Sequence, residues 1–211
     1  MTKLYALDLR YYEKGRWQEL LVALPPERRQ RALACRFEPD KMRIACAGWL
    51  LQKALERAGI PAEEQIFAES QWGKPYLKHR KDLHFSLSHS GVWAVCAVSD
   101  ENVGVDVELP RCSMAVARRC FRAEELQGLD PLDRYRQADA LNRLWTAKEA
   151  FLKMLGKGLT LPLDSFTVRL GETAELVQSY TDLPYRLHEY SLGLYRVCLC
   201  CTDEKPELEV L

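Results

Sequence analysis

The chain has 211 residues, 47% of them hydrophobic and 28% charged, which is ordinary for a globular protein long enough to bury a sizeable core. Thirty basic and thirty acidic residues give a formal net charge of zero, which argues against a general nucleic-acid binder because such proteins are usually basic overall. No apolar run approaches the length of a membrane span, and the N-terminal segment lacks the apolar core of a signal peptide. We therefore expect a cytoplasmic protein with no membrane partner.

The cysteines are expected to be reduced. Eight of them are scattered along the chain. Cys96, Cys198 and Cys200 lie inside apolar, strand-like runs, where a thiol acts as a small core side chain. The Cys-Leu-Cys-Cys run at 198–201 matches no common zinc-site spacing.

The first half of the chain is predicted to hold strands around two helices. Pro25-Pro26 opens a basic helix, and Asp40 caps a longer helix that ends before Gly59. We expect this long helix at 41–57, strands at 3–9, 84–88 and 92–98, and a turn at 72–76.

The second half repeats this order faintly. A long helix, a glycine-containing turn and apolar strands with cysteine occur at about 41–98 and again at about 138–202. This repeat predicts an α+β fold made of two similar α/β lobes, 1–103 and 104–211, with a ligand cleft between them. We expect helices at 118–121, 123–128 and 138–154, and strands at 166–170, 185–191 and 195–202.

The segment Gly104-Val105-Asp106-Val107-Glu108 predicts a strand with two chemically different faces. Side chains alternate across a strand, so the valines share one face, and Asp106 and Glu108 share the other. Two neighbouring carboxylates repel each other, and a hard cation such as Mg²⁺ relieves the repulsion. A half-exposed edge strand with solvated acids is the alternative interpretation.

A second acidic position lies on the helix at 138–154. Glu149 follows Trp145 by one turn at the edge of an apolar stripe, and Lys153 follows one turn later. A Glu at the border of a core is costly unless something pairs with it, and a metal held by Asp106 and Glu108 would serve. An ordinary surface pair between Glu149 and Lys153 is the alternative.

In this order the two segments resemble the signatures of the 4'-phosphopantetheinyl transferases of the large, two-lobed Sfp-like type. The signatures are (I/V)-G-(I/V)-D-(I/V)-E, found here at 103–108, and W-(S/T)-x-K-E-(A/S)-x-x-K, found at 145–153. Each motif alone is weak, but the ordered pair is specific. The resemblance covers about 26–170 and implies a pseudo-dimer fold. It also implies transfer of the phosphopantetheine arm of coenzyme A to a carrier-protein serine, with release of 3',5'-ADP and with Mg²⁺ or Mn²⁺ as cofactor.

The resemblance also implies roles for individual residues. Asp106, Glu108 and Glu149 would hold the metal, and Lys153 would neutralise the leaving phosphate. Glu124, Glu149 or a water would take the proton of the carrier serine. The G-K-P turn and the S-H-S run of the family are also present. The residues expected to contact coenzyme A are Arg28, Arg31, Arg43, Gly73, Lys74, Pro75, Ser88, His89 and Lys153.

Other possibilities remain open at this point. The same acids could serve another Mg²⁺-dependent phosphotransfer enzyme or a nuclease, or the chain could be a silent coenzyme A-binding module. Ile44 stands where relatives often carry a small hydroxyl residue, so no side-chain contact to coenzyme A is expected there. The partners expected are an apo acyl or peptidyl carrier protein and coenzyme A, bound by a monomer, and the sequence does not name the carrier. Basic residues that either meet an acidic carrier or form a solvated face are Arg111, Arg118, Arg119 and Arg122.

Overall fold

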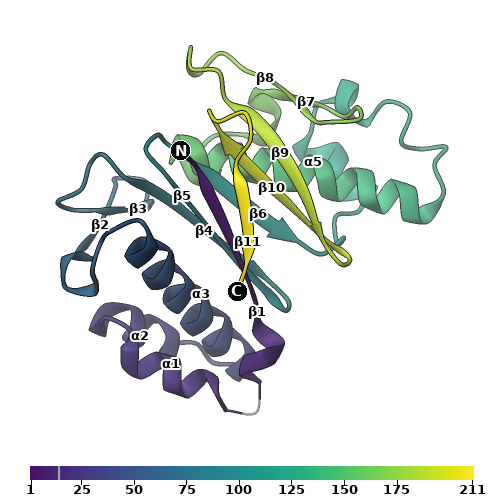
Figure 1. The fold of residues 1–211 in the computed structure, drawn as a ribbon. Coiled ribbons are helices and arrows are strands. Elements are labelled where there is room, and N and C mark those ends of the chain that lie inside the picture. Colours follow the sequence, from purple (N-terminus) through teal and green to yellow (C-terminus); the bar gives the residue numbers. More distant parts are fainter. Residues whose placement is uncertain (14) are drawn as a thin grey trace.

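Two long helices, α3 (Glu38–Arg57) and α5 (Arg134–Leu155), each pack on a sheet of their own (Figure 1). The structure is a computed structural model, and it describes residues 1–13 and 15–211. Asp133 caps α5 by accepting hydrogen bonds from the amides of Tyr135 and Arg136, and Gly156 ends it with a positive φ of 69°. This cap explains why α5 begins four residues before the predicted start at 138.

The first sheet has the strand order β11-β1-β5-β4 and carries α3 on one face. Helices α1 (Trp17–Ala23) and α2 (Pro26–Leu33) pack on α3 on the side away from the sheet, and β2 (Phe67–Glu69) and β3 (Pro75–Leu77) form a short antiparallel ribbon (Figure 1). The strands of this sheet are β1 (Lys3–Asp8), β4 (His84–Ser90), β5 (Trp93–Ser99) and β11 (Glu207–Val210).

The second sheet has the order β6-β10-β9, is antiparallel throughout and packs on α5. Its strands are β6 (Gly104–Glu108), β9 (Arg186–Leu192) and β10 (Tyr195–Cys201). Strands β7 (Thr167–Arg169) and β8 (Glu175–Val177) form a separate ribbon. Helix α4 (Met114–Cys120) precedes α5. Short 3-10 helices are η1 (Leu9–Tyr12), η2 (Ala62–Glu64), η3 (Ala123–Leu126), η4 (Gly158–Thr160) and η5 (Leu163–Ser165).

The two halves share one topology. A strand, a long helix, a two-stranded ribbon and a hairpin occur as β1, α3, β2-β3 and β4-β5, and again as β6, α5, β7-β8 and β9-β10. The sheet order β1-β5-β4 also corresponds to β6-β10-β9. The predicted α+β fold of two similar lobes is therefore confirmed.

The last strand departs from the predicted division of the chain at 103/104. Although β11 lies near the C-terminal end of the sequence, it pairs in parallel with β1 and extends the first sheet (Figure 1, yellow beside purple). The boundary between the two domains stays a prediction, because sheet membership alone does not define independently folding units.

A shared apolar core joins the lobes. Val103, Val105 and Val107 of the β6 segment are fully buried against β1, β5 and β10. The predicted apolar face of this strand is thus confirmed, and it packs against the other lobe. All eight cysteines are free, and five of them are buried, as expected for reduced core residues. Among the described residues, no helix is both long and apolar enough to cross a bilayer.

Gly104 marks the place where β6 comes closest to α5. A Cβ atom at this position would lie 1.9 Å from the carbonyl oxygen of Ala150 and 2.4 Å from the amide nitrogen of Met154. Both atoms belong to the backbone of a helix, so neither can rotate away.

We expect Gly104→Ala to destabilise the protein by about 3 kcal/mol, because strand and helix must move apart. Urea unfolding followed by circular dichroism measures this change. Gly171→Ala is the matched control, because its added methyl would make only one ordinary contact, at 3.4 Å from the carbonyl oxygen of Thr173. Equal stabilities of the two variants would contradict the prediction.

Candidate active site

The junction of the lobes encloses a cavity of about 780 Å³ whose walls come from both halves of the chain. One wall is built from α2, α3 and the β2-β3 ribbon, and the other from β6 and α5, with β4 between them. The lining residues are Glu27, Arg28, Arg31, Ile44, Ala47, Phe67, Ala68, Glu69, Gly73, Pro75, Leu87, Ser88, His89, Asp106, Glu108, Trp145, Glu149 and Lys153.

Asp106 is the most deeply buried of the acids in the cavity, with 2% of its surface exposed. Its Oδ1 lies 2.6 Å from Nζ of Lys153 and accepts a hydrogen bond of 2.7 Å from the Ser88 hydroxyl. Its Oδ2 is buried and has no hydrogen-bond partner among the residues that the structure describes. A buried, unpaired carboxylate oxygen is costly, so this atom is available to a ligand that brings positive charge or a donor.

Glu108 and Glu149 have pKa values above the ordinary range. Burial is the main cause for both, and the negative charge of Asp106 raises both further. A hydrogen bond from Ser90 partly offsets the effect at Glu108, and Lys153 partly offsets it at Glu149. The three carboxylates therefore repel one another in a poorly solvated place, which is the situation that a divalent cation relieves.

The residues fit a divalent cation in donor type, and Asp106 Oδ2 offers an unused ligand atom. In the part of the chain that the structure describes, however, no three acidic, His or Cys side chains gather closely enough to hold a metal ion. The ammonium group of Lys153 already neutralises one oxygen of Asp106. The assignment of Asp106, Glu108 and Glu149 as metal ligands therefore stays a prediction.

The opposite wall carries positive charge. Arg28 and Arg31 lie on the same face of α2 and line the cavity, as their spacing predicts. The Arg28 guanidinium lies 4.6 Å from the ring centroid of Phe67, and burial lowers its pKa. His89 also lines the cavity, and desolvation and the nearby cations Lys153 and Arg43 lower its pKa.

Two residues expected to contact coenzyme A are engaged elsewhere. Arg43 pairs with Asp40 on α3 and does not line the cavity. Lys74 donates hydrogen bonds of 3.1 Å to the carbonyl oxygens of Val103 and Met154, so its side chain ties the β2-β3 turn to the second lobe. Burial lowers the pKa of Lys74 to about 8. Its neighbours Gly73 and Pro75 do line the cavity.

Glu124, a candidate base, is exposed on η3 and does not line the cavity. Its carboxylate accepts a hydrogen bond of 2.8 Å from the hydroxyl of Thr167. Of the two candidate bases, the structure brings Glu149 alone into the cavity, because α5 passes along it and η3 does not.

Sequence reasoning missed several lining residues and one polar contact. Phe67 and Ala68 belong to β2, which is too short to show a periodic pattern. Ser90 donates a hydrogen bond of 2.7 Å to Oε2 of Glu108. The alternation of serines at 86, 88 and 90 was the available signal, since it places three hydroxyls on one face of β4.

Comparison with known proteins agrees with this geometry. The model of the 4'-phosphopantetheinyl transferase superfamily matches residues 102–200, and that of the N-terminal part of 4'-phosphopantetheinyl transferases matches 13–101. The chain is 33% identical to the 4'-phosphopantetheinyl transferase Sfp of Bacillus subtilis (strain 168), over 87% of this chain and 84% of that protein. The chain belongs to the 4'-phosphopantetheinyl transferase superfamily.

Two other relatives support this membership of the superfamily. The chain is 34% identical to the 4'-phosphopantetheinyl transferase psf-1 of Bacillus pumilus, over 94% of this chain and 89% of that protein. It is also 34% identical to a 4'-phosphopantetheinyl transferase of Bacillus subtilis, over 80% of this chain and 76% of that protein. The chain is therefore an enzyme that transfers the 4'-phosphopantetheinyl group.

A buried ion pair supports the helix that carries the acids and lysine of this transferase. Lys148 Nζ lies 2.6 Å from Oε1 of Glu125, and both side chains are 0% exposed. Lys148 also donates to the carbonyl oxygens of Leu163 and Phe166, so it joins α5 to the segment before β7. Its neighbour on α5 is Glu149, which faces the cavity.

We expect Lys148→Met to cost about 3–5 kcal/mol of folding free energy, because it leaves the buried Glu125 carboxylate without its cation. The double variant Lys148→Met/Glu125→Gln should recover part of that loss, since no buried charge remains. Urea unfolding measures both. Lys53→Met, which breaks the partly exposed pair with Glu56, is the control and should stay within about 0.5 kcal/mol of the parent.

The raised pKa values of Glu108 and Glu149 predict a pH-dependent stability. The fold favours their protonated forms, so their contribution is fully present below the ordinary pKa of 4.5 and is lost as the pH rises through their raised values. Without added metal, Glu149→Gln should therefore be more stable than the parent at pH 7, and the difference should shrink towards pH 4. Thermal unfolding between pH 4 and pH 8 measures it. A difference that does not change with pH would contradict the prediction.

Proposed function

We propose that the acceptor is a serine of an apo acyl or peptidyl carrier protein, and that coenzyme A donates the phosphopantetheinyl group and leaves as 3',5'-ADP. One observation carries this proposal. Acidic residues and a lysine from the second lobe line the same cavity as two arginines from the first, which suits a ligand with phosphates at two places.

The cavity supports one orientation of coenzyme A. Arg28 and Arg31 offer two guanidinium groups to the 3'-phosphate, and Gly73 and Pro75 lie near the β2 residues that would meet the adenine. Ser88 and Lys153 contact Asp106, and His89 lines the same cavity, so the pyrophosphate would meet both hydrogen-bond donors and the acids there. The pantetheine arm would then leave the cavity towards the carrier protein.

Asp106, Glu108 and Glu149 would hold the divalent cation, Mg²⁺ or Mn²⁺. When bound there, the cation would offset the negative charge of the pyrophosphate. The protein's own contribution is to desolvate Glu108 and Glu149, at the expense of their raised pKa values.

The reaction needs no covalent enzyme intermediate. The carrier serine oxygen forms a bond to the β-phosphorus of coenzyme A, the bond from that phosphorus to the bridging oxygen breaks, and 3',5'-ADP leaves with the electron pair. Lys153 lies beside Asp106 and neutralises charge on the leaving phosphate. We assign the serine proton to Glu149 rather than Glu124, because Glu149 lines the cavity and Glu124 does not.

We propose a cytoplasmic monomer. The two walls of the cavity come from one chain, so a second copy is not needed to complete it. Eight free cysteines, five of them buried, agree with a reducing compartment.

Intact-mass spectrometry of a panel of apo-carriers with coenzyme A and Mg²⁺ tests the proposal. One phosphopantetheinyl group should be added to at least one carrier, and EDTA should stop the reaction. Asp106→Ala should abolish turnover while the far-UV circular dichroism stays unchanged. Cleavage of coenzyme A without carrier modification would instead indicate another phosphotransfer enzyme, and binding without either reaction a silent module.

The same assay separates the two candidate bases. Glu149→Gln should lower kcat about 10²–10⁴-fold, the range for loss of a general base, whereas Glu124→Gln should change it little. The reverse order would return the base role to Glu124.

A further inference from the structure

Three serines at alternating positions of β4 form hydrogen bonds to β6, a strand of the other sheet. Strands β4 and β6 belong to different sheets, yet Ser86 Oγ accepts a hydrogen bond of 3.0 Å from the Val105 amide. Further along, the Ser88 and Ser90 hydroxyls donate to Asp106 Oδ1 and Glu108 Oε2, each at 2.7 Å. All three serines are buried, so these contacts are shielded from water.

We propose that Ser90 is a positioning residue, which turns the Glu108 carboxylate so that its other oxygen is presented to a divalent cation in the cavity. This inference rests on the proposed function, because it concerns the same site. It adds a residue that does not line the cavity and that acts through Glu108.

Further contacts hold the residues at both ends of the hydrogen bond between Ser90 and Glu108. After Ser90 the chain turns at Gly91, where a Cβ atom would lie 2.0 Å from the Tyr195 hydroxyl, and that hydroxyl accepts from the Val92 amide at 3.3 Å. On the other side, the Asn142 side chain of α5 donates to the backbone carbonyl of Glu108 at 2.9 Å. The serine and the glutamate backbone are therefore held by β10 and α5, and the hydrogen bond selects the remaining side-chain rotation.

Each of the two acids of β6 accepts a hydrogen bond from a serine of β4 on one carboxylate oxygen. One oxygen of Asp106 is occupied by Ser88 and Lys153, and the other is buried without a hydrogen-bond partner in residues 1–13 and 15–211. One oxygen of Glu108 is occupied by Ser90, and within the described chain no hydrogen bond reaches the other. Each serine thus leaves one carboxylate oxygen per acid for a ligand. Outer hydrogen-bond partners of this kind orient metal ligands and set metal affinity.

Calorimetric titration of Mn²⁺ and Mg²⁺ into the full chain, without coenzyme A or carrier, tests this role. We expect Ser90→Ala to weaken cation binding about 10–100-fold. Ser86→Ala is the matched control, since it removes an equally buried hydroxyl of the same strand that contacts a backbone amide instead of an acid. It should leave cation affinity unchanged even where it lowers the melting temperature.

A second set of variants covers the case in which Ser90→Ala folds poorly. Ser90→Cys keeps a side chain of similar size with a weaker donor, so its cation affinity should fall between those of the parent and the alanine variant. In a Glu108→Gln background, Ser90→Ala should cause no further loss of affinity, because the serine acts through that carboxylate.

The outcomes separate the two proposals. If the parent binds the cation and Asp106→Ala abolishes the binding, while Ser90→Ala and Ser90→Cys bind as the parent does, the positioning role is overturned and the proposed function stands. If the folded parent binds no cation in the titration and modifies carriers in the presence of EDTA, both the metal assignment and the positioning role are overturned. A loss with Ser90→Ala that is the same in the Glu108→Gln background would also overturn the positioning role.

Discussion

The burial of negative charge at the junction of the lobes is the constraint on which this structure depends. Asp106 lies on a strand whose other face is packed into the core shared by the two sheets, so it cannot turn to solvent. A carboxylate in such a place must be paired, and its partners Ser88 and Lys153 come from β4 and α5. The acid on β6 therefore depends on both lobes, and the geometry that permits its burial also places it in the cavity.

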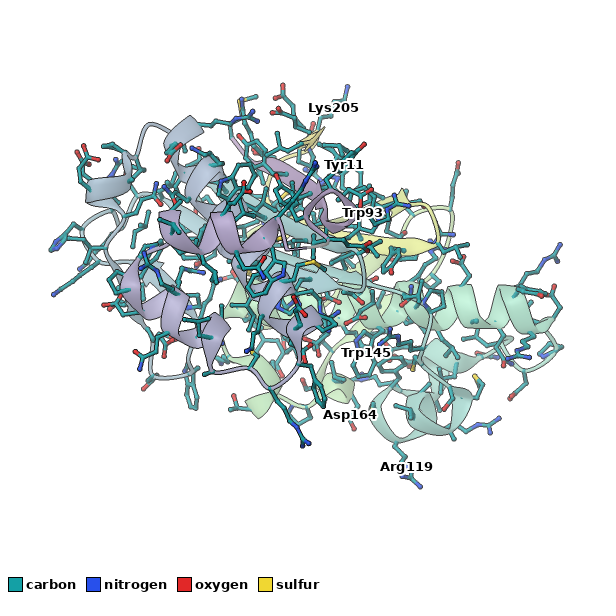
Figure 2. The ribbon with its side chains drawn as sticks, turned by 90° about the horizontal axis from the view of Figure 1, so that it is seen from below. Tyr11, Trp93, Arg119, Trp145, Asp164 and Lys205 are labelled. Atoms are coloured by element: carbon teal, nitrogen blue, oxygen red, sulfur yellow. The ribbon has the colours of Figure 1, made fainter. Side chains whose placement is uncertain are left out.

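The two lobes have one topology but supply different chemistry. The helices α3 and α5 hold equivalent places, yet α3 gives the cavity apolar side chains, Ile44 and Ala47, and α5 gives it Glu149 and Lys153. Positive charge from the first lobe comes instead from α2, which packs on α3. A second cavity, of about 690 Å³, is lined by Tyr11 and Trp93 among others. These two residues lie well apart from Trp145 of the first cavity in Figure 2. None of the predicted site residues lines the second cavity. Apart from Glu124, Arg43 and Lys74, the residues predicted to carry the chemistry line the cavity between the lobes.

Much of the site was readable from the chain because strand and helix periods decide which side chains share a face. Asp106 and Glu108 on one side of a strand, Arg28 and Arg31 on one side of a helix, and Glu149 one turn before Lys153 all line the cavity. The far ends of two long side chains are placed by neighbours that the periods do not reveal. Lys74, expected at coenzyme A, binds the carbonyl oxygens of Val103 and Met154, and Arg43 turns back to Asp40 on its own helix.

By itself, the sequence determined the family, the repeated lobe and the identity of the acids, because these follow from local periodicity and from motifs of fixed spacing. Only the tertiary structure decided which oxygen of Asp106 is taken by Lys153, that Glu125 is buried against Lys148, and that Ser90 contacts Glu108. The physical reason is desolvation. Segments far apart in the chain remove water from a charged group, and the group then pairs with whichever donor those segments bring within reach.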